Sequence, residues 1–254
     1  MAGHNKWSKV KHRKAVVDKR KGKALSMCSR AIISAVRQHG TDPTFNHALR
    51  AAIDEARYHN VPGDNIERAI KKGAGSGQGD DYEHVRYEGY GPAGVAVVVD
   101  ALTDNRTRTA ANIRLVFDTH SGKMGTSGCV SHQFEHKGRI EVKGVASDED
   151  RILEAAMNAG ADDAKFNDEA GEDAAWDVFC PPTELHTVKA ALEASKLVVR
   201  QTTTEMLPSQ IVTVHAAVAR EVIDLIDELE DDEDVKRVYS NADIPESELA
   251  KLGG

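Results

Sequence analysis

Basic side chains are concentrated at the start of the chain, where they could neutralise a row of phosphates. Through residue 23 the sequence has nine Lys and Arg residues against one acid, Asp18. Trp7 adds an aromatic face on which a base could stack. Such a segment binds nucleic acid with little sequence preference and strong salt dependence. The residues expected to contact nucleic acid are Lys6, Trp7, Lys9, Lys11, His12, Arg13, Lys14, Lys19, Arg20, Lys21, Lys23 and Arg30.

The simpler interpretation of this basic segment is a solvated charge run or a disordered tail. Residues 1 to about 23 are predicted to form an arm, with Gly3 and Gly22 as breaks. The helices predicted to follow continue the basic character, which favours the nucleic-acid interpretation. Their basic residues are Arg30, Arg37, Arg50, Arg57, Arg68, Lys71 and Lys72.

The net charge hides this segregation. The chain has 254 residues with 33 Lys and Arg against 41 Asp and Glu, a formal charge of -8 that alone argues against a nucleic-acid binder. Through Lys72 there are 16 basic and 6 acidic residues, and the remainder has 17 and 35. The charges of the two parts are therefore +10 and -18. A polycationic head is followed by a polyanionic body.

Two loops are candidates for a ligand or interaction site. The turn at residues 87–94 offers the aromatic faces of Tyr87 and Tyr90, and its glycines permit close backbone approach, but a tight hairpin held by its own aromatic packing is equally compatible. Residues 104–109 lie where a strand should meet a helix, so Arg106 and Arg108 could assist anion binding at the helix N-terminus. The alternative there is an ordinary Asp or Asn cap with solvated arginines.

Motifs for catalysis, metal binding and cofactors are missing from the sequence. There is no G-x-S-x-G, no H-E-x-x-H and no close pair of Cys or His ligands, so we expect no enzyme, no metal site and no cofactor. The three cysteines are expected to be small apolar residues. The acidic run near residues 224–234 lacks EF-hand spacing and is interpreted as a solvated helix end or a face that repels nucleic acid.

Hydrophobic periodicity predicts three helices in the head. The first carries Leu25, Cys28, Ile32, Ala35 and Val36 on one face and stops at Gly40. The second is expected to begin with Asp42 as N-cap and Pro43 at the first helical position. Its predicted apolar face is Phe45, Ala48, Leu49, Ala52, Ile53 and Ala56. The third should start at a capping box of Asp64 and Glu67 and end at Gly73.

A glycine-rich stretch at residues 73–79 is interpreted as a linker, and the body beyond it alternates strands with helices. The expected strands are 85–88, 95–102, 129–134, 140–142, 164–166, 176–179, 197–200, 211–214 and 235–239, with helices near 113–117, 147–157, 185–192 and 218–229. The order within 138–200 is the ferredoxin-like β-α-β-β-α-β motif.

These elements predict an α+β fold: an N-terminal three-helix domain and two ferredoxin-like α/β domains, one inserted in the other. The boundaries are residues 1–79 for the basic arm and helical domain, 80–136 plus 208–254 for a discontinuous middle domain, and 137–207 for the insert. The longest uncharged apolar stretch, 95–99, is far shorter than the roughly 20 residues of a membrane span. No membrane association is expected, and the cytoplasm is the expected compartment.

Several motifs together resemble the YebC/PmpR family, essentially from end to end. They are the opening residues 1–14, Leu49-Arg-Ala-Ala-Ile-Asp54, Ile66-Glu-Arg-Ala-Ile70, Tyr87-Glu-Gly-Tyr-Gly-Pro92 and Asp104-Asn-Arg-Thr-Arg-Thr109. The resemblance implies the same three-domain architecture and a cytoplasmic transcriptional regulator that binds promoter DNA. Related members act in translation, associate with the ribosome and help synthesis through proline-rich stretches. The family often has Asn where this chain has Thr107.

Three functional hypotheses follow. The first is a non-enzymatic regulator that binds DNA through its basic N-terminal region and works with the transcription machinery. The second is a ribosome-associated translation factor that contacts ribosomal or transfer RNA with the same residues. The third is an α/β enzyme or metabolite-binding module that uses the turn at 87–94 and Arg106, which the missing motifs disfavour.

Overall fold

A computed structural model describes residues 14–75, 81–167 and 174–245, with backbone alone for 14–21, 216 and 217. Contacts between residues divide the chain into two compact units. The first comprises residues 1–52, 61–135 and 208–254, and the second comprises 53–60 and 136–207. The division into three domains stays a prediction. No helix within the described ranges is long and apolar enough to cross a membrane.

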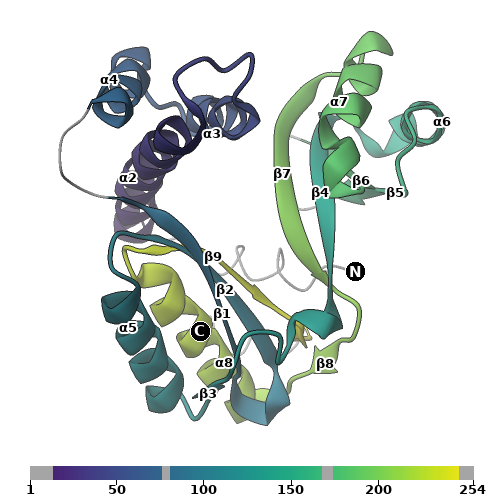
Figure 1. Ribbon diagram of the computed structural model, residues 1–254. Helices are drawn as coiled ribbons and strands as arrows, with labels where there is room; N and C mark the ends of the chain where they lie inside the picture. Colours follow the sequence, from purple (N-terminus) through teal and green to yellow (C-terminus); the bar gives the residue numbers. More distant parts are fainter. Residues whose placement is uncertain (1–13, 76–80, 168–173, 246–254) are drawn as a thin grey trace. The chain divides into compact units, whose positions relative to one another are not determined.

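Three helices form the head, as the periodicity predicts (Figure 1). They are α2 (Lys14–His39), α3 (His47–Tyr58) and α4 (Gly63–Ala74). The apolar face of α2 is buried, with Ile32 1% and Val36 3% exposed. At Gly73, α4 comes so close to α2 that an added Cβ would lie 2.8 Å from the Val36 Cβ. A glycine at this position therefore sets the spacing of the two helices.

The helix boundaries in the head differ from those predicted. The backbone is already helical at Lys14, and Gly22 lies inside α2 instead of separating an arm from a helix. A glycine inside a helix costs about 1 kcal/mol, which a 26-residue helix tolerates. Helix α4 follows Pro62 and has no side-chain cap hydrogen bond, so the predicted capping box does not form.

The start of α3 is also displaced from the prediction. Asp42 and Pro43 lie in a turn, and the capping side chain is that of Asn46, whose Oδ1 accepts the N–H of Leu49 at 2.9 Å. Since the helix begins at His47, Phe45 precedes it and is not on its apolar face. The Phe45 side chain is 82% exposed, which corrects its predicted place in the core.

The middle domain is a four-stranded sheet with two helices, and its strand order is β3-β1-β2-β9. Its elements are β1 (Glu83–Tyr90), a 3₁₀ turn (Pro92–Gly94), β2 (Ala96–Thr103), α5 (Arg106–Thr119), β3 (Lys123–Met124), α8 (Ala216–Asp231) and β9 (Val235–Ser240). A short parallel pair, β8 (Val212–Thr213) and β10 (Ala242–Asp243), forms a separate two-stranded sheet. The chain therefore completes the sheet after the insert, as predicted.

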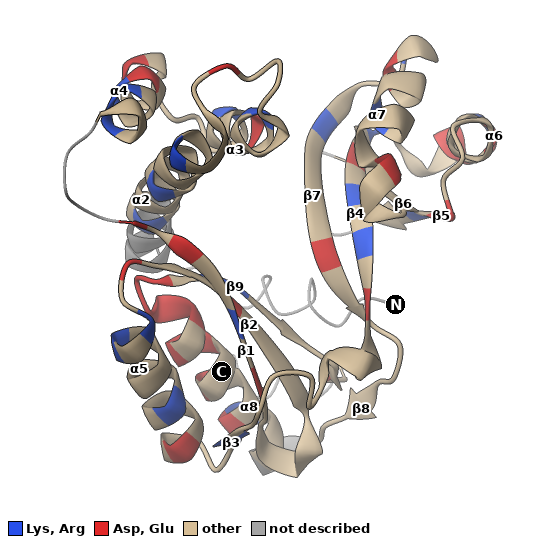
Figure 2. Ribbon diagram, in the orientation of Figure 1, with Lys and Arg blue, Asp and Glu red and all other residues tan. Residues whose placement is uncertain are grey.

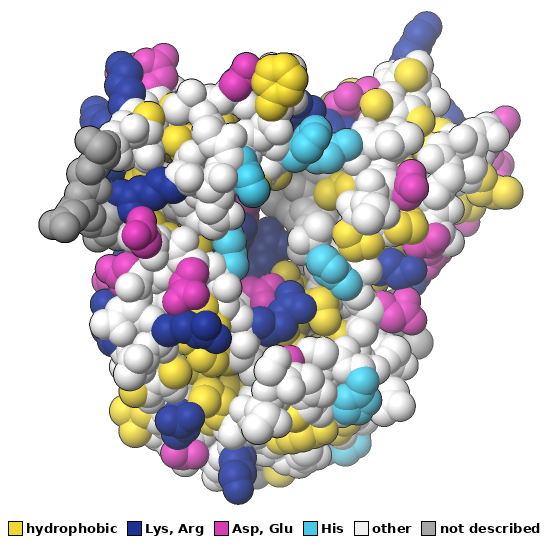
Figure 3. All heavy atoms as spheres, in the orientation of Figure 1, with side chains coloured by type: hydrophobic (Ala, Val, Ile, Leu, Met, Phe, Trp, Pro, Cys, Tyr) yellow, Lys and Arg dark blue, Asp and Glu magenta, His cyan; other side chains and the backbone are white. Residues whose placement is uncertain are grey.

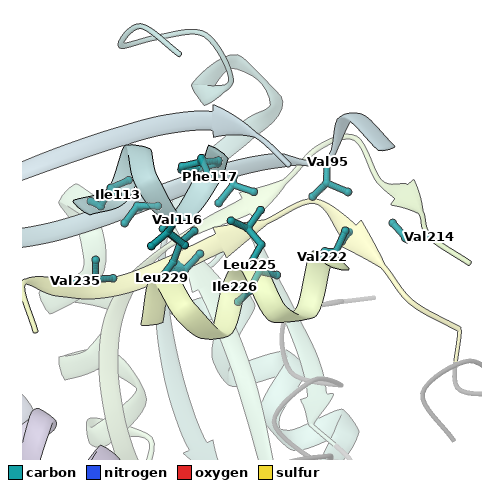
Figure 4. Close-up of a cluster of buried hydrophobic side chains, with 14 of the residues drawn as sticks. Val95, Ile113, Val116, Phe117, Val214, Val222, Leu225, Ile226, Leu229 and Val235 are labelled. Atoms are coloured by element: carbon teal, nitrogen blue, oxygen red, sulfur yellow. The ribbon is translucent and has the colours of Figure 1, made fainter. Parts of the chain in front are cut away.

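Both helices of the middle domain lie on one face of its sheet. Ile113 and Phe117 of α5 and Leu225 and Leu229 of α8 are fully buried against the valines of the central strand β2 (Figure 4). Apolar surface buried at about 25 cal/mol per Å² is the main stabilising contribution in such a core. This packing fixes the end of α8, which carries the acidic run.

The second unit contains the insert, whose sheet order is β5-β6-β4-β7. Its elements are β4 (Phe134–Lys143), α6 (Glu149–Asn158), β5 (Asp163–Asn167), β6 (Ala175–Cys180), α7 (Leu185–Ala194) and β7 (Val199–Pro208). Counted within the insert, this is the 2-3-1-4 order of the ferredoxin-like motif. The two helices share one core with Ile140, Trp176 and Val178. The other face of the sheet carries charged side chains such as Arg139 and, opposite it in register, the buried ring of Phe179.

One predicted strand does not form. Residues 129–134 were expected to be extended, but the chain there makes a turn and a 3₁₀ helix (Ser131–Gln133) before β4 begins at Phe134. The carboxylate of Glu88 accepts the backbone N–H groups of Gly128, Val130 and Ser131, each at 2.9 Å. Those N–H groups are therefore not available to a strand ladder.

Candidate nucleic-acid interface

The predicted nucleic-acid-binding residues fall into three groups. Lys6, Trp7, Lys9, Lys11, His12 and Arg13 lie outside the described residues. Four more, Lys14, Lys19, Arg20 and Lys21, are placed by their backbone in the first turns of α2. Only Lys23 and Arg30 have described side chains.

Lys23 and Arg30 both contact the acidic end of α8 and the loop after it. The Lys23 ammonium donates to the carbonyl of Glu230. The Arg30 guanidinium donates to the Glu233 carbonyl at 3.1 Å and to Asp234 Oδ1 at 2.9 Å. Figure 2 marks the basic positions along α2 in blue and the acidic positions along α8 in red. The acidic run was predicted to be solvated, yet at this end it is a docking surface for the head.

Asp234 is the centre of this contact, and its side chain is 6% exposed. Besides Arg30, its carboxylate accepts from Arg108 at 2.7 Å, Thr109 Oγ1 at 2.8 Å and Thr103 Oγ1 at 3.2 Å. Burial acts to raise the pKa of Asp234, but the hydrogen bonds from Arg108, Thr109 and Arg30 outweigh it and lower the pKa. The carboxylate is therefore held in its charged form between two cations.

Further contacts hold the head against the middle domain. Ser34 Oγ donates to the Tyr82 carbonyl at 3.0 Å, and Arg30 lies 5.5 Å from the centroid of the Tyr82 ring. Arg37 forms an ion pair with Asp81. Each of these residues lies on the buried or half-buried side of α2 or directly before β1. These contacts join α2 to the segment directly before β1.

Residues of the turn at 87–94 contact neighbouring segments of the middle domain. Tyr87 donates to the carbonyl of Arg106 at 3.2 Å, and Tyr90 donates to the carbonyl of Cys129 at 3.1 Å. Burial raises the pKa of Tyr87. An added Cβ on Gly89 would lie 2.7 Å from the Lys123 carbonyl. All three contacts are made with other segments of the middle domain, and a ligand site at this turn stays a prediction.

Glu88, in the same turn, is a residue that the sequence analysis did not single out. Glu88 is 2% exposed, and its carboxylate accepts hydrogen bonds from three backbone N–H groups of the loop 128–131. Burial acts to raise the pKa of Glu88, while the hydrogen bonds from Ser131, Gly128 and Val130 lower it overall. Its place in an otherwise apolar and aromatic turn was the only sequence signal. A charge there needs a dedicated partner.

Arg106 and Arg108 lie in the first turn of α5. Asn105 is the N-cap, since its Oδ1 accepts the N–H of Arg108 at 3.0 Å. The Arg108 guanidinium lies 2.7 Å from carboxylate oxygens of both Asp104 and Asp234, and these hydrogen bonds raise its pKa. Arg106, two-thirds exposed, lies 3.8 Å from Glu83. Arg108 is therefore a structural partner of Asp234, and its side chain is also 47% exposed to solvent.

The insert has its own charged cluster on the polar face of its sheet. Arg139 lies 2.7 Å from Asp177 Oδ1, 3.1 Å from Glu205 Oε1 and 3.5 Å from Glu141 Oε2. Burial raises the pKa of Asp177 even though Arg139 acts to lower it. The cluster joins three neighbouring strands of one sheet, β6, β4 and β7.

Groups that could perform metal chemistry are not assembled in the described part of the chain. No cluster of three or more His, Cys, Asp or Glu side chains there has a geometry that could hold a metal ion. On the face in Figure 3, acidic and basic side chains are interspersed, without a large patch of one sign.

Comparison with known proteins identifies the family of this chain. A family model described as the TACO1/YebC protein N-terminal domain matches residues 5–76, and a model of the TACO1/YebC second and third domain matches 82–242. The chain belongs to the TACO1/YebC family. This membership confirms the resemblance noted from the motifs, and the break between the two models coincides with the glycine-rich linker.

Relatives match the chain from end to end. A "Probable transcriptional regulatory protein" of Nitrosococcus oceani is 47% identical over 253 residues, and one of Rubrobacter xylanophilus is 43% identical over 255, each with 100% of both chains covered. The crystal structure of a conserved hypothetical protein from Aquifex aeolicus is 43% identical, with a TM-score of 0.81 over 93% of this chain and 96% of that one. The TACO1/YebC fold predicted from the sequence, with helices first and α/β domains after them, is thus confirmed.

Proposed function

We propose that this chain is a non-enzymatic regulatory protein that binds nucleic acid through its basic N-terminal region, and that its use is in transcription, with DNA as the target. The observation that carries the proposal is the charge of +10 through residue 72 against -18 in the rest. The names of its relatives, probable transcriptional regulatory proteins, support the regulatory part.

The contacts of the head divide its basic residues into two groups. Lys23 and Arg30 are used to dock α2 on the middle domain. We assign the neutralisation of phosphates to the cations before them in the chain, from Lys6 to Lys21. In this proposal the polyanion binds at the N-terminal end of α2, because the chain beyond residue 72 carries a net charge of -18 and repels it.

The test is the salt dependence of binding to a DNA duplex. Replacing Lys6, Lys9, Lys11 and Lys14 by Gln should weaken binding and reduce the slope of log K against log salt by about 0.9 for each phosphate that the protein no longer neutralises. A matched variant that replaces Lys123, Lys143, Lys165 and Lys196 removes the same charge from the body and should leave the slope unchanged. Equal slopes for the two variants would sink the proposal.

An experiment in cells distinguishes DNA from RNA as the target. Crosslinking followed by sequencing of the bound nucleic acid should recover promoter DNA if the regulator acts in transcription. Recovery mainly of ribosomal RNA would overturn the transcriptional part and select the ribosome-associated translation factor, which would use the same basic residues.

A further inference from the structure

Phe45 is the most exposed of the large hydrophobic side chains that the structure describes, at 82%. It lies in the turn between α2 and α3, directly before the buried N-cap of α3. A single exposed apolar residue is common on protein surfaces and by itself needs no explanation. Phe45 differs from such residues because hydrogen bonds hold the turn that carries it.

The turn is fixed by hydrogen bonds on both sides of Phe45. The Asp42 carbonyl accepts the N–H of Phe45 at 3.2 Å and of Asn46 at 2.9 Å, and the Asp42 carboxylate accepts the N–H of Thr44 at 2.8 Å. Asn46, 1% exposed, donates to the carbonyls of Ala35 at 2.8 Å and Gly40 at 2.7 Å. The backbone that carries the ring is already ordered, so binding to the ring costs little further conformational entropy.

Arg50 brings a cation to the same turn. Its Nε donates to the Pro43 carbonyl at 3.0 Å and its terminal nitrogen to the Thr44 carbonyl at 2.9 Å. Exposed polar side chains, those of Thr44 and His47, flank Phe45 on either side. The acid of this turn, Asp42, is engaged by the Thr44 N–H. The ring is thus an apolar face with a guanidinium nearby and polar neighbours along the chain.

This setting suits a nucleobase better than a protein. A protein interface of ordinary size buries about 800 Å² on each partner around an apolar core, which a single ring does not supply. A base needs only the face of one ring, and its phosphate is attracted by the head's excess of cations. We propose that Phe45 is a stacking platform for one unpaired base of a single-stranded nucleic acid bound along the head.

This inference rests on the proposed function and deepens it, because stacking on Phe45 requires a base that is not paired in a duplex. It predicts that the protein has a greater affinity for single strands, or for duplexes with an unpaired segment, than phosphate contacts alone provide. Stacking carries no net charge, so the contribution of Phe45 adds to affinity without changing the number of counterions released.

The experiment measures binding of the full chain to a labelled 20-nucleotide poly-dT strand, a poly-U strand and a 20-base-pair duplex over a series of salt concentrations. Phe45→Ala should weaken single-strand binding about 5- to 100-fold at every salt concentration. The salt slope and the duplex affinity should not change. Phe45→Trp should retain or strengthen binding, whereas Phe45→Leu, which keeps an apolar side chain without a ring, should behave like the Ala variant.

Leu115→Ala is the matched control, since it removes another exposed apolar side chain, 65% exposed on α5. It should bind single strands like the parent chain, and all these variants should keep the parent melting temperature. Unchanged single-strand affinity of Phe45→Ala, or full affinity of Phe45→Leu, overturns the stacking platform alone. If the parent chain binds none of the three probes, the proposed function fails together with it.

Discussion

At the residue scale, two buried carboxylates organise the first unit. Glu88 and Asp234 belong to sequence stretches with opposite character, a turn rich in glycine and tyrosine and a run of acids. Each is nevertheless surrounded by donors, backbone N–H groups around Glu88 and Arg and Thr side chains around Asp234. A buried charge is tolerated when its hydrogen bonds replace those of water. Both residues therefore position segments of chain and are not reactive groups.

Replacing Asp234 by Asn should destabilise the protein by about 3–5 kcal/mol, because it leaves the guanidinium groups of Arg30 and Arg108 without their shared counter-charge. Urea unfolding at pH 7 measures this change. Glu233→Gln is the control, since that neighbouring side chain is 90% exposed and its loss should cost less than about 0.5 kcal/mol. Equal losses of unfolding free energy in the two variants would show that the buried contacts of Asp234 do not stabilise the protein.

Glu88→Gln should reduce stability by about 3 kcal/mol at neutral pH, since the amide replaces a charged acceptor of three N–H groups. The lowered pKa of Glu88 means that the carboxylate stabilises the fold above its ordinary value of 4.5. That contribution disappears as the pH falls through the lowered folded-state pKa. The difference between the parent and the variant should therefore narrow below pH 4.5 in a series of denaturation curves. A constant difference down to about pH 2 would contradict this.

At the element scale, the spacing of helices depends on positions that periodicity does not identify. Gly73 was predicted as the end of the third helix, yet it lies inside α4 and faces α2. Gly22 was predicted as a break and lies inside α2. A glycine in a sequence marks either an interruption or a close approach, and only the neighbouring element distinguishes them.

Gly73→Ala should destabilise the head by about 1–3 kcal/mol, because its Cβ would lie 2.8 Å from the Val36 Cβ and 3.1 Å from the Ile33 carbonyl. Gly63→Ala, at the start of the same helix, meets nothing within 4 Å and should be neutral or stabilising by up to about 1 kcal/mol. The pair of melting curves checks the close approach, since helix propensity alone would favour Ala at both positions. Stabilisation by both variants would argue against tight packing at Gly73.

At the scale of the whole molecule, the chain has two compact units, and the described parts of each have a hydrophobic core. The chain passes between the two units four times, near residues 52, 60, 135 and 207. Because each unit has a hydrophobic core of its own, we expect the units to unfold in separate cooperative transitions.

Trp176, 4% exposed, reports on the core of the second unit when the other tryptophan is removed by Trp7→Phe. In that background, Asp234→Asn should move part of the far-ultraviolet circular dichroism transition to a lower urea concentration. The urea midpoint of the Trp176 fluorescence transition should not change. Val178 is fully buried beside Trp176. Val178→Ala should lower the free energy of unfolding measured by fluorescence by about 2 kcal/mol. A common shift of both signals in every variant would mean that the two units unfold together.

Sequence alone determined the fold class, the order of most elements and the charge segregation, because these depend on local pattern and on composition. Hydrophobic periodicity located α8 and the strands of the insert, and the motifs identified the TACO1/YebC family before any coordinates. The least accurate part was the short connections, such as residues 42–46 and 129–134, where side-chain hydrogen bonds replaced the expected cap and strand.

Only the tertiary structure decided what the charges contact. Arg30 and Arg108 are far apart in sequence and meet at Asp234, and the acidic run that looked solvated receives the basic helix. Phe45 is exposed because its neighbour Asn46 caps the helix. Local pattern cannot determine such pairings, because the free energy of a charge or an aromatic ring depends on which distant segment covers it, and that is fixed only when the whole chain packs.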